Sequence, residues 1–171
     1  ASDVYKRQAF SVNAQGSGAT AVTTTKQLKV TQGKLECKAL SSCLMDDSGD
    51  YINLGNYDEF AFGDASNDTP FTFAAWVNVD DATSNAIITA YNQYAFGFNG
   101  SDKLYMDIYD NVDTVHERQT STATLTAYEN TWVHVAATYS GVGGTSANAG
   151  IQLYVNGVAI AQDAGDAGSY T

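Results

Sequence analysis

Two neighbouring segments near the carboxyl end of the chain constrain its fold most strongly. Residues 131–139 (TWVHVAATY) alternate large and small side chains, which is typical of a strand in a β-sandwich. Residues 151–155 (IQLYV) alternate apolar and polar side chains and run into Asn156-Gly157, a pair that accepts the positive φ angles of a tight hairpin turn. These patterns predict a strand, followed by a β-hairpin over residues 151–160 whose first strand buries one face.

Strand and turn signals repeat through the rest of the chain at the spacing of a sandwich. The clearest is 71–79, where Phe71, Phe73 and Ala75 share one face. The pair Asn99-Gly100 predicts a short hairpin turn, so we expect Phe98 and Leu104 to lie on paired strands. The other predicted strands are 51–54, 86–91, 94–98, 103–109 and 114–120, with weaker candidates at 27–31 and 39–45.

Composition agrees with an all-β protein and limits its partners. No segment has the period of an amphipathic helix, and the fifteen glycines and eleven tyrosines suit strands joined by tight turns. Eight basic and nineteen acidic residues give a formal net charge of −11. Nucleic acid and anionic membranes require clustered Lys and Arg, so both are excluded as partners. No apolar run approaches the ~20 residues that span a bilayer. An acidic surface suits divalent cations or neutral ligands such as sugars.

Four segments, taken in order, resemble a known family. They are residues 50–55 (DYINLG), 70–77 (PFTFAAWV), 132–139 (WVHVAATY) and 151–157 (IQLYVNG). This order resembles the laminin-G-like and pentraxin-like branch of the concanavalin A-like lectin/glucanase superfamily, over roughly Ala39 to Tyr170. The resemblance implies an antiparallel jelly-roll β-sandwich over residues 36–171. It also implies an extracellular binding module, since most members of this branch are not enzymes.

Both ends of the chain fall outside this pattern. Residues 1–8 resemble a translated sequencing-adapter remnant of the kind found in environmental assemblies, and residues 9–35 are expected to form a linker or an edge strand. In the family, further strands follow the segment that matches the 151–160 hairpin. Here residues 163–171 contain mainly Gly, Ala, Asp and Ser, so we expect the sandwich to lack its last strands.

Catalytic motifs are absent from the sequence. The glucanase members of the superfamily place two carboxylates close together on one strand, so that one acts as acid and the other as nucleophile. No two of the four glutamates lie within five residues of each other, and no Gly-x-Ser-x-Gly elbow occurs. His134 is interpreted as a strand residue with a hydrogen bond, and His116 as an exposed strand residue. The chain is therefore predicted not to be an enzyme.

Two groups of aspartates could bind Ca²⁺ through hard oxygen ligands. They are Asp46, Asp47 and Asp50 in one turn, and Asp107, Asp110 and Asp113 at intervals of three. The alternative is that Asp and Gly simply form turns. The resemblance favours calcium, because many laminin-G-like domains hold this ion on rim loops. We therefore take Asp47 and Asp50, at the entry to a matched strand, as the predicted metal ligands.

A sugar-binding patch is predicted at Tyr91, Asn92, Gln93 and Tyr94, which combine aromatic rings with amide groups on an expected loop. Tyr105 and Tyr109 share one face of a nearby predicted strand. The alternative is that these tyrosines are ordinary strand residues. Trp76 and Trp132 fall within predicted strands and are expected to lie in the core instead.

The combined prediction is a non-catalytic module that binds a glycan or a surface protein, with calcium assistance, at the cell or virion surface. Two alternatives remain open: an adhesive domain of a virion or tail-fibre protein, and a targeting module attached to a separate hydrolase. Cys37 and Cys43 lie six positions apart and could form a disulfide or remain thiols.

Overall fold

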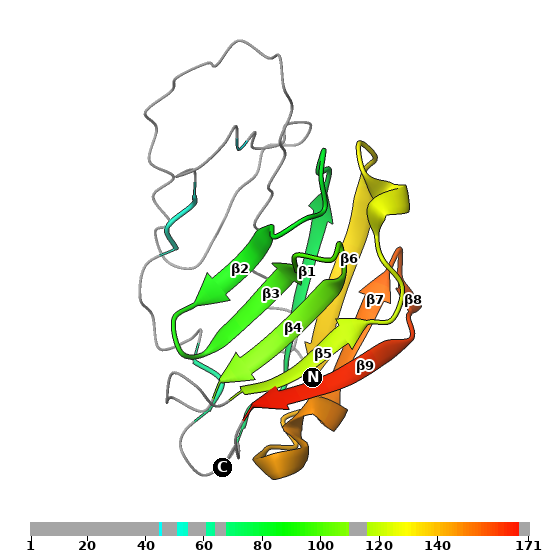
Figure 1. The fold of residues 1–171 in the computed structure, drawn as a ribbon. Helices are drawn as coiled ribbons and strands as arrows, with labels where there is room; N and C mark the ends of the chain where they lie inside the picture. The colour runs from blue at the N-terminus through cyan, green and yellow to red at the C-terminus, as the bar shows by residue number, and fades with distance from the viewer. Residues whose placement is uncertain (1–44, 46–50, 55–60, 64–67, 110–115, 168–171) are drawn as a thin grey trace.

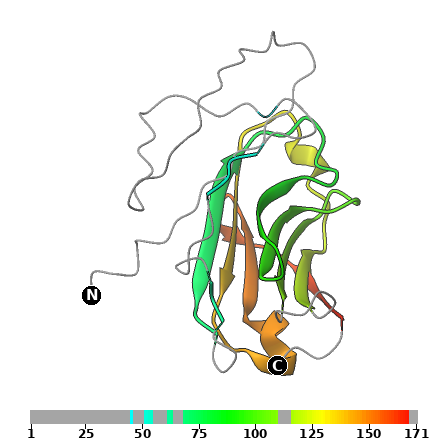
Figure 2. The same ribbon diagram turned by 90° about the vertical axis from the view of Figure 1, so that its left-hand side faces the viewer.

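Nine strands in the described residues form two antiparallel sheets that face each other (Figures 1 and 2). The computed structural model describes residues 45, 51–54, 61–63, 68–109 and 116–167. The four-stranded sheet has the order β1 (Phe71–Val77), β6 (Val133–Tyr139), β7 (Ile151–Val155) and β8 (Val158–Ala159). The five-stranded sheet has the order β2 (Ala86–Ala90), β3 (Tyr94–Phe98), β4 (Leu104–Tyr109), β5 (His116–Ser121) and β9 (Gln162–Ala167). Two 3-10 helices lie at Thr126–Tyr128 and Gly144–Gly150.

The core lies between the sheets and is built by the period-2 alternation of the strands. Strand β7 shows this clearly, because Ile151, Leu153 and Val155 are buried while the residues between them are only partly covered. Phe96 on β3 and Met106 on β4 are fully buried on the facing sheet. The predicted all-β sandwich, and the buried face predicted for 151–155, are therefore confirmed.

The two Asn-Gly pairs form different turns. Asn156 and Gly157 have φ angles of 50° and 79°, so both lie in the left-handed region, as the sequence predicts for a two-residue hairpin. Phe98 and Leu104 are paired, as expected, but their connection is a longer loop in which the positive φ falls on Asp102. The Asn99 side chain explains the difference, because its Oδ1 accepts the backbone N–H groups of Ser101 and Lys103.

Two strand predictions were wrong. Residues 51–54 form no strand, because none of the described strands pairs with them, although Leu54 packs against the core. Conversely, Gln162–Ala167 forms β9 and pairs with β5 along its whole length, from Gln162 opposite Ser121 to Ala167 opposite His116. The residues of β9 have low intrinsic strand propensity. The segment forms a strand because it hydrogen-bonds to the edge of β5. The candidate at 27–31, both cysteines and all of the candidate at 39–45 except Met45 lie outside the described residues, and Met45 is not in a strand.

The tryptophans were also predicted wrongly, since both are exposed rather than in the core. Trp76 keeps 54% of its surface exposed and Trp132 keeps 45%. Phe73, Ala75 and Val77 occupy the inner face of β1, so the alternation directs Trp76 outward.

A polar layer on the inner face of β5 holds the loop that follows β6. The Gln119 side chain donates to the carbonyl of Asn148 at 3.0 Å, and the Glu117 carboxylate accepts the N–H of the same residue at 3.4 Å. Asn148 lies in the 3-10 helix Gly144–Gly150. These bonds, made by two buried side chains, attach the helix to the sheet.

Candidate functional site

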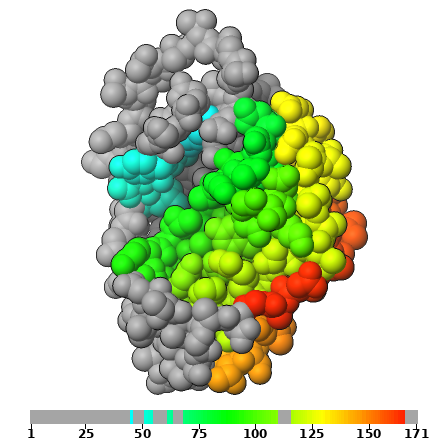
Figure 3. Space-filling view, in the orientation of Figure 1, coloured from blue at the N-terminus to red at the C-terminus, as the bar shows by residue number. Residues whose placement is uncertain are grey.

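The outer face of the five-stranded sheet carries a cluster of aromatic and charged side chains. From β4, Tyr105, Asp107 and Tyr109 point away from the core, and from β5 His116 and Arg118 do the same. The antiparallel register places Asp107 opposite Arg118 and Tyr109 opposite His116. Figure 3 views the molecule onto this sheet. The shared face predicted for Tyr105 and Tyr109 is thus formed.

A bidentate ion pair lies at the centre of this cluster. Arg118 Nε and Nη2 donate to Asp107 Oδ1 and Oδ2, each at 2.5 Å. Asp107 is only 1% exposed, whereas the Arg118 side chain is 35% exposed. Hydrogen bonding to Asp107 raises the pKa of the Arg118 guanidinium further above its ordinary value. The pair therefore presents planar hydrogen-bonding groups with little net charge.

Two tyrosines flank the ion pair. The Arg118 guanidinium carbon lies 5.1 Å from the centre of the Tyr105 ring, and Tyr109 donates its hydroxyl proton to Asp107 Oδ2 at 3.2 Å. Burial, and then the charge of Asp107, raise the pKa of Tyr109 to about 12. Its ring also lies 5.4 Å from that of His116. Both phenols therefore remain neutral hydrogen-bonding groups at physiological pH.

These contacts do not favour the second predicted calcium group. Both carboxylate oxygens of Asp107 are bonded to Arg118, so this residue is not free to ligate an ion. Asp110 and Asp113 lie outside the described residues. Asp107 also has no acidic partner for glycosidase chemistry on β5, because the neighbouring Glu117 points to the opposite side of the sheet.

The predicted sugar-binding residues separate in the structure. Tyr91 is 84% exposed in the turn between β2 and β3, where Asn92 has a φ of 54°. The carbonyl of Gln93 accepts the N–H of Tyr109 at 2.9 Å, so this turn adjoins the end of β4. Tyr94 is instead a core residue: it is 4% exposed, its ring lies 4.8 Å from that of Phe73, and burial raises its pKa. The correction follows from alternation, because β3 begins at Tyr94 with its inner face.

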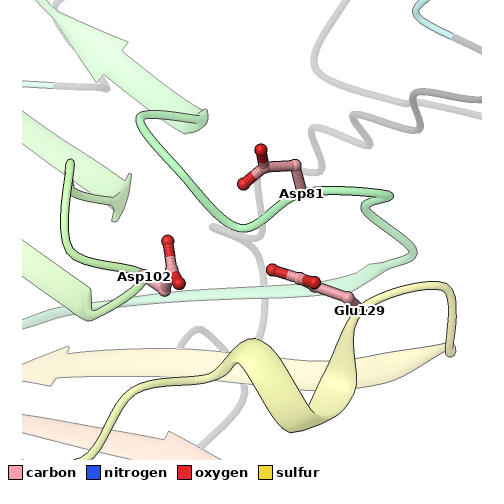
Figure 4. Close-up of side chains that lie close together, drawn as sticks. All are labelled: Asp81, Asp102 and Glu129. Carbon is pink, nitrogen blue, oxygen red and sulfur yellow. The ribbon is translucent and has the colours of Figure 1, made fainter.

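A second candidate site lies at the opposite end of the sandwich, where three carboxylates meet (Figure 4). Asp81 follows β1, Asp102 lies in the loop between β3 and β4, and Glu129 follows the 3-10 helix Thr126–Tyr128. One oxygen of each lies within 4.8 Å of the others. We call these three residues the acidic rim.

Neighbouring donors hold each carboxylate of the acidic rim. Asp102 accepts the hydroxyl protons of Thr83 at 2.6 Å and Thr126 at 2.9 Å. Glu129 accepts the backbone N–H of Ala82 at 3.1 Å. Hydrogen bonds from the side chain and backbone of Thr83 lower the pKa of Asp81. The three carboxylates of the acidic rim are therefore oriented by short-range hydrogen bonds.

The sequence did not reveal the acidic rim, because its members are far apart in the chain. The available signal was that each acid lies within two residues of the end of a predicted strand (71–79, 103–109 or 131–139). The predicted metal ligands Asp47 and Asp50 lie outside the described residues, so their assignment stays a prediction.

The fold and the comparisons agree on the class of protein. A family model described as the concanavalin A-like lectin/glucanases superfamily (Laminin_G_3) matches residues 46–171. The chain therefore belongs to this family, whose laminin-G-like members are typically non-catalytic binding modules. Searches of curated proteins and of solved structures gave no match. No helix in the described part of the chain is long and apolar enough to cross a membrane.

Proposed function

We propose that this domain is a non-catalytic module that recognises a neutral glycan on the outer face of its five-stranded sheet. The observation that carries the proposal is the cluster in which Tyr105 and Tyr109 flank the Asp107–Arg118 pair. The exposed Tyr91 and the Gln93 turn border it, because Gln93 bonds to Tyr109. Aromatic faces next to fixed polar groups suit the apolar faces and hydroxyls of a sugar ring.

Charge supports a neutral ligand. The chain carries a formal net charge of −11, and Arg118 is already paired with Asp107. An anionic glycan would therefore meet a repulsive field without a free cation at this cluster. A protein ligand, an adhesive role in a virion or tail fibre, and a targeting role beside a hydrolase remain the alternatives. Location at a cell or virion surface belongs to the same proposal.

Binding should depend on the two tyrosines at the edge of the cluster. We expect Tyr91→Ala and Tyr109→Ala each to weaken binding of a neutral oligosaccharide about tenfold, the loss of about 1.4 kcal/mol of contact energy. Isothermal titration against hits from a neutral glycan array would measure this. Tyr51→Ala is the matched control, because Tyr51 is 78% exposed and belongs to neither site. Equal affinity in all variants would contradict the proposed site.

We further propose that the acidic rim holds Ca²⁺. Its three carboxylates come from three loops, and oxygen ligands of this kind suit the ion. A divalent cation would also relieve the repulsion between carboxylate oxygens held within 4.8 Å of one another. Asp80, next to Asp81, has a buried Oδ1 that accepts no hydrogen bond from the described residues, so this end of the sandwich has a further uncompensated acceptor.

Calcium should then stabilise the fold. At a concentration 100 times its dissociation constant it is expected to add about 2.7 kcal/mol to the free energy of unfolding. Thermal unfolding followed by near-UV circular dichroism, in calcium and in excess chelator, would measure the shift. Asp102→Asn should abolish most of it, whereas Asp163→Asn, an exposed acid on β9, should preserve it. A cooperative transition with the same midpoint temperature in calcium and in chelator would rule out the rim as a calcium site.

A further inference from the structure

The outer face of the four-stranded sheet is uncharged, although the chain as a whole is strongly acidic. Its outward positions on the fully described strands β1, β6 and β7 carry small, polar or aromatic side chains and no Asp, Glu, Lys or Arg. These positions are Thr72, Ala74, Trp76, His134, Ala136, Thr138, Gln152 and Tyr154, and Trp132 precedes β6 on the same side. On a surface with a formal charge of −11, a neutral patch of this extent requires an explanation.

Two exposed indoles stand at one end of this face. Trp76 lies opposite His134 in the register, and their rings are 5.4 Å apart in an edge-on arrangement. Trp132 is two residues before His134, so strand geometry places the Cα atoms of the two tryptophans roughly 8 Å apart. Trp76 leaves 54% of its surface exposed and Trp132 leaves 45%, so about half of each residue remains open to solvent. Leaving such large aromatic groups in water is costly unless a ligand covers them.

The support beneath the indoles is rigid. The Asn156 side chain accepts the backbone N–H of His134 at 3.1 Å, and the Asn156 N–H donates to the carbonyl of His134 at 2.7 Å. The turn between β7 and β8 therefore fixes the start of β6. Beyond it, Ala74 and Ala136 are paired and form a low floor between the tryptophans and Tyr154. A row of small side chains beside exposed aromatic groups suits an extended ligand.

We infer that this face is a second ligand site, which binds a neutral polysaccharide chain laid across the four-stranded sheet. Its groups are indoles, hydroxyls, an imidazole and an amide, which match the apolar ring faces and hydroxyls of such a chain and offer nothing to a charged one. The site lies on the sheet opposite to the one proposed above, so the two assignments stand independently.

A second copy of the chain suits this face less well. The sheet has two strands of seven residues (β1 and β6), one of five (β7) and one of two (β8). At a rise of about 3.3 Å per residue and a spacing of about 4.8 Å, they cover roughly 330 Å². Stable protein interfaces bury about 800 Å² on each partner. The acidic remainder of both copies would also repel as they approached. The face is therefore too small to hold two copies together but large enough for a sugar chain.

Affinity electrophoresis through native gels that contain a soluble neutral polysaccharide (a β-glucan, a mannan or a galactan) would test the inference. We expect at least one polymer to retard the protein and to shift its tryptophan emission. The double substitution Trp76→Ala and Trp132→Ala should reduce the affinity at least tenfold, whereas Tyr91→Ala should not. The double variant Trp76→Phe and Trp132→Phe should retain most binding, which separates loss of stacking from loss of folding.

Three results would overturn the inference. The first is that no polymer in the panel retards the protein. The second is that the wild type and the Trp-to-Ala variant are retarded equally. The third is a dimer in sedimentation that the Trp-to-Ala substitutions convert to a monomer. Sensitivity to Tyr91→Ala alone would support the five-stranded face and reject this one.

Discussion

Replacing Arg118 with methionine is expected to lower the free energy of unfolding by about 3 kcal/mol. The substitution keeps an unbranched apolar chain about as long as the aliphatic part of arginine but removes both hydrogen bonds to Asp107. Asp107 is 1% exposed, so its charge would stay buried with only Tyr109 as a donor among these partners. We expect the lower end of the usual range for a broken buried pair, because a third of the Arg118 side chain reaches solvent. Urea denaturation would measure the loss.

The double variant separates two costs: that of leaving the Asp107 charge buried and unpaired, and that of losing the ion pair itself. Changing Asp107→Asn together with Arg118→Met removes both charges, so it should cost less than Arg118→Met alone. Lys103→Met is the matched control, since this cation lies in the loop before β4, and its side chain makes none of these bonds. It should stay within about 0.5 kcal/mol of the wild type. An Arg118→Met variant as stable as this control would mean that the ion pair does not form.

Replacing Gly97 with alanine should destabilise the fold at least as much as Arg118→Met does. We expect it to lower the free energy of unfolding by about 3 kcal/mol or more. A Cβ atom at this position would lie 2.3 Å from the Asn85 carbonyl oxygen and 3.0 Å from the Ala86 Cα, so it would meet backbone that cannot rotate away. The same carbonyl accepts the N–H of Phe98 at 2.7 Å. The pairing of β2 with β3 is irregular between Ala86 and Ile88, and this irregularity brings the two chains together at Gly97.

Gly100→Ala provides the comparison for Gly97. A Cβ atom there would lie 3.5 Å from the Ser84 hydroxyl oxygen, an ordinary contact. We expect a change within about 0.5 kcal/mol. Amide hydrogen exchange should also show earlier opening of β2 in the Gly97 variant. If both variants unfold at the same urea concentration, the close approach of Asn85 to Gly97 is not present in solution.

Alternation by itself determined most of the sandwich. Strands β3 and β6 and the hairpin at Asn156-Gly157 follow from local patterns, because a strand with one buried face must place apolar groups at every second residue. The same alternation places Trp76 on the outer face of β1, because Phe73, Ala75 and Val77 occupy the inner face. The wrong prediction for both tryptophans came from their position within predicted strands, without regard to which face of the strand they occupy.

Only the tertiary structure decided how the sites are assembled. Strand β9 forms because the edge of β5 is there to receive it, and Asp107 meets Arg118 through the register of two strands. Asp81, Asp102 and Glu129 converge because three loops end at one rim of the sandwich. Hydrogen-bonded pairing and loop placement depend on contacts between residues distant in the chain, which a local pattern does not encode. Local patterns therefore predict the class of fold and the inward faces of its strands, whereas the outward side chains that meet depend on strand pairing and loop placement.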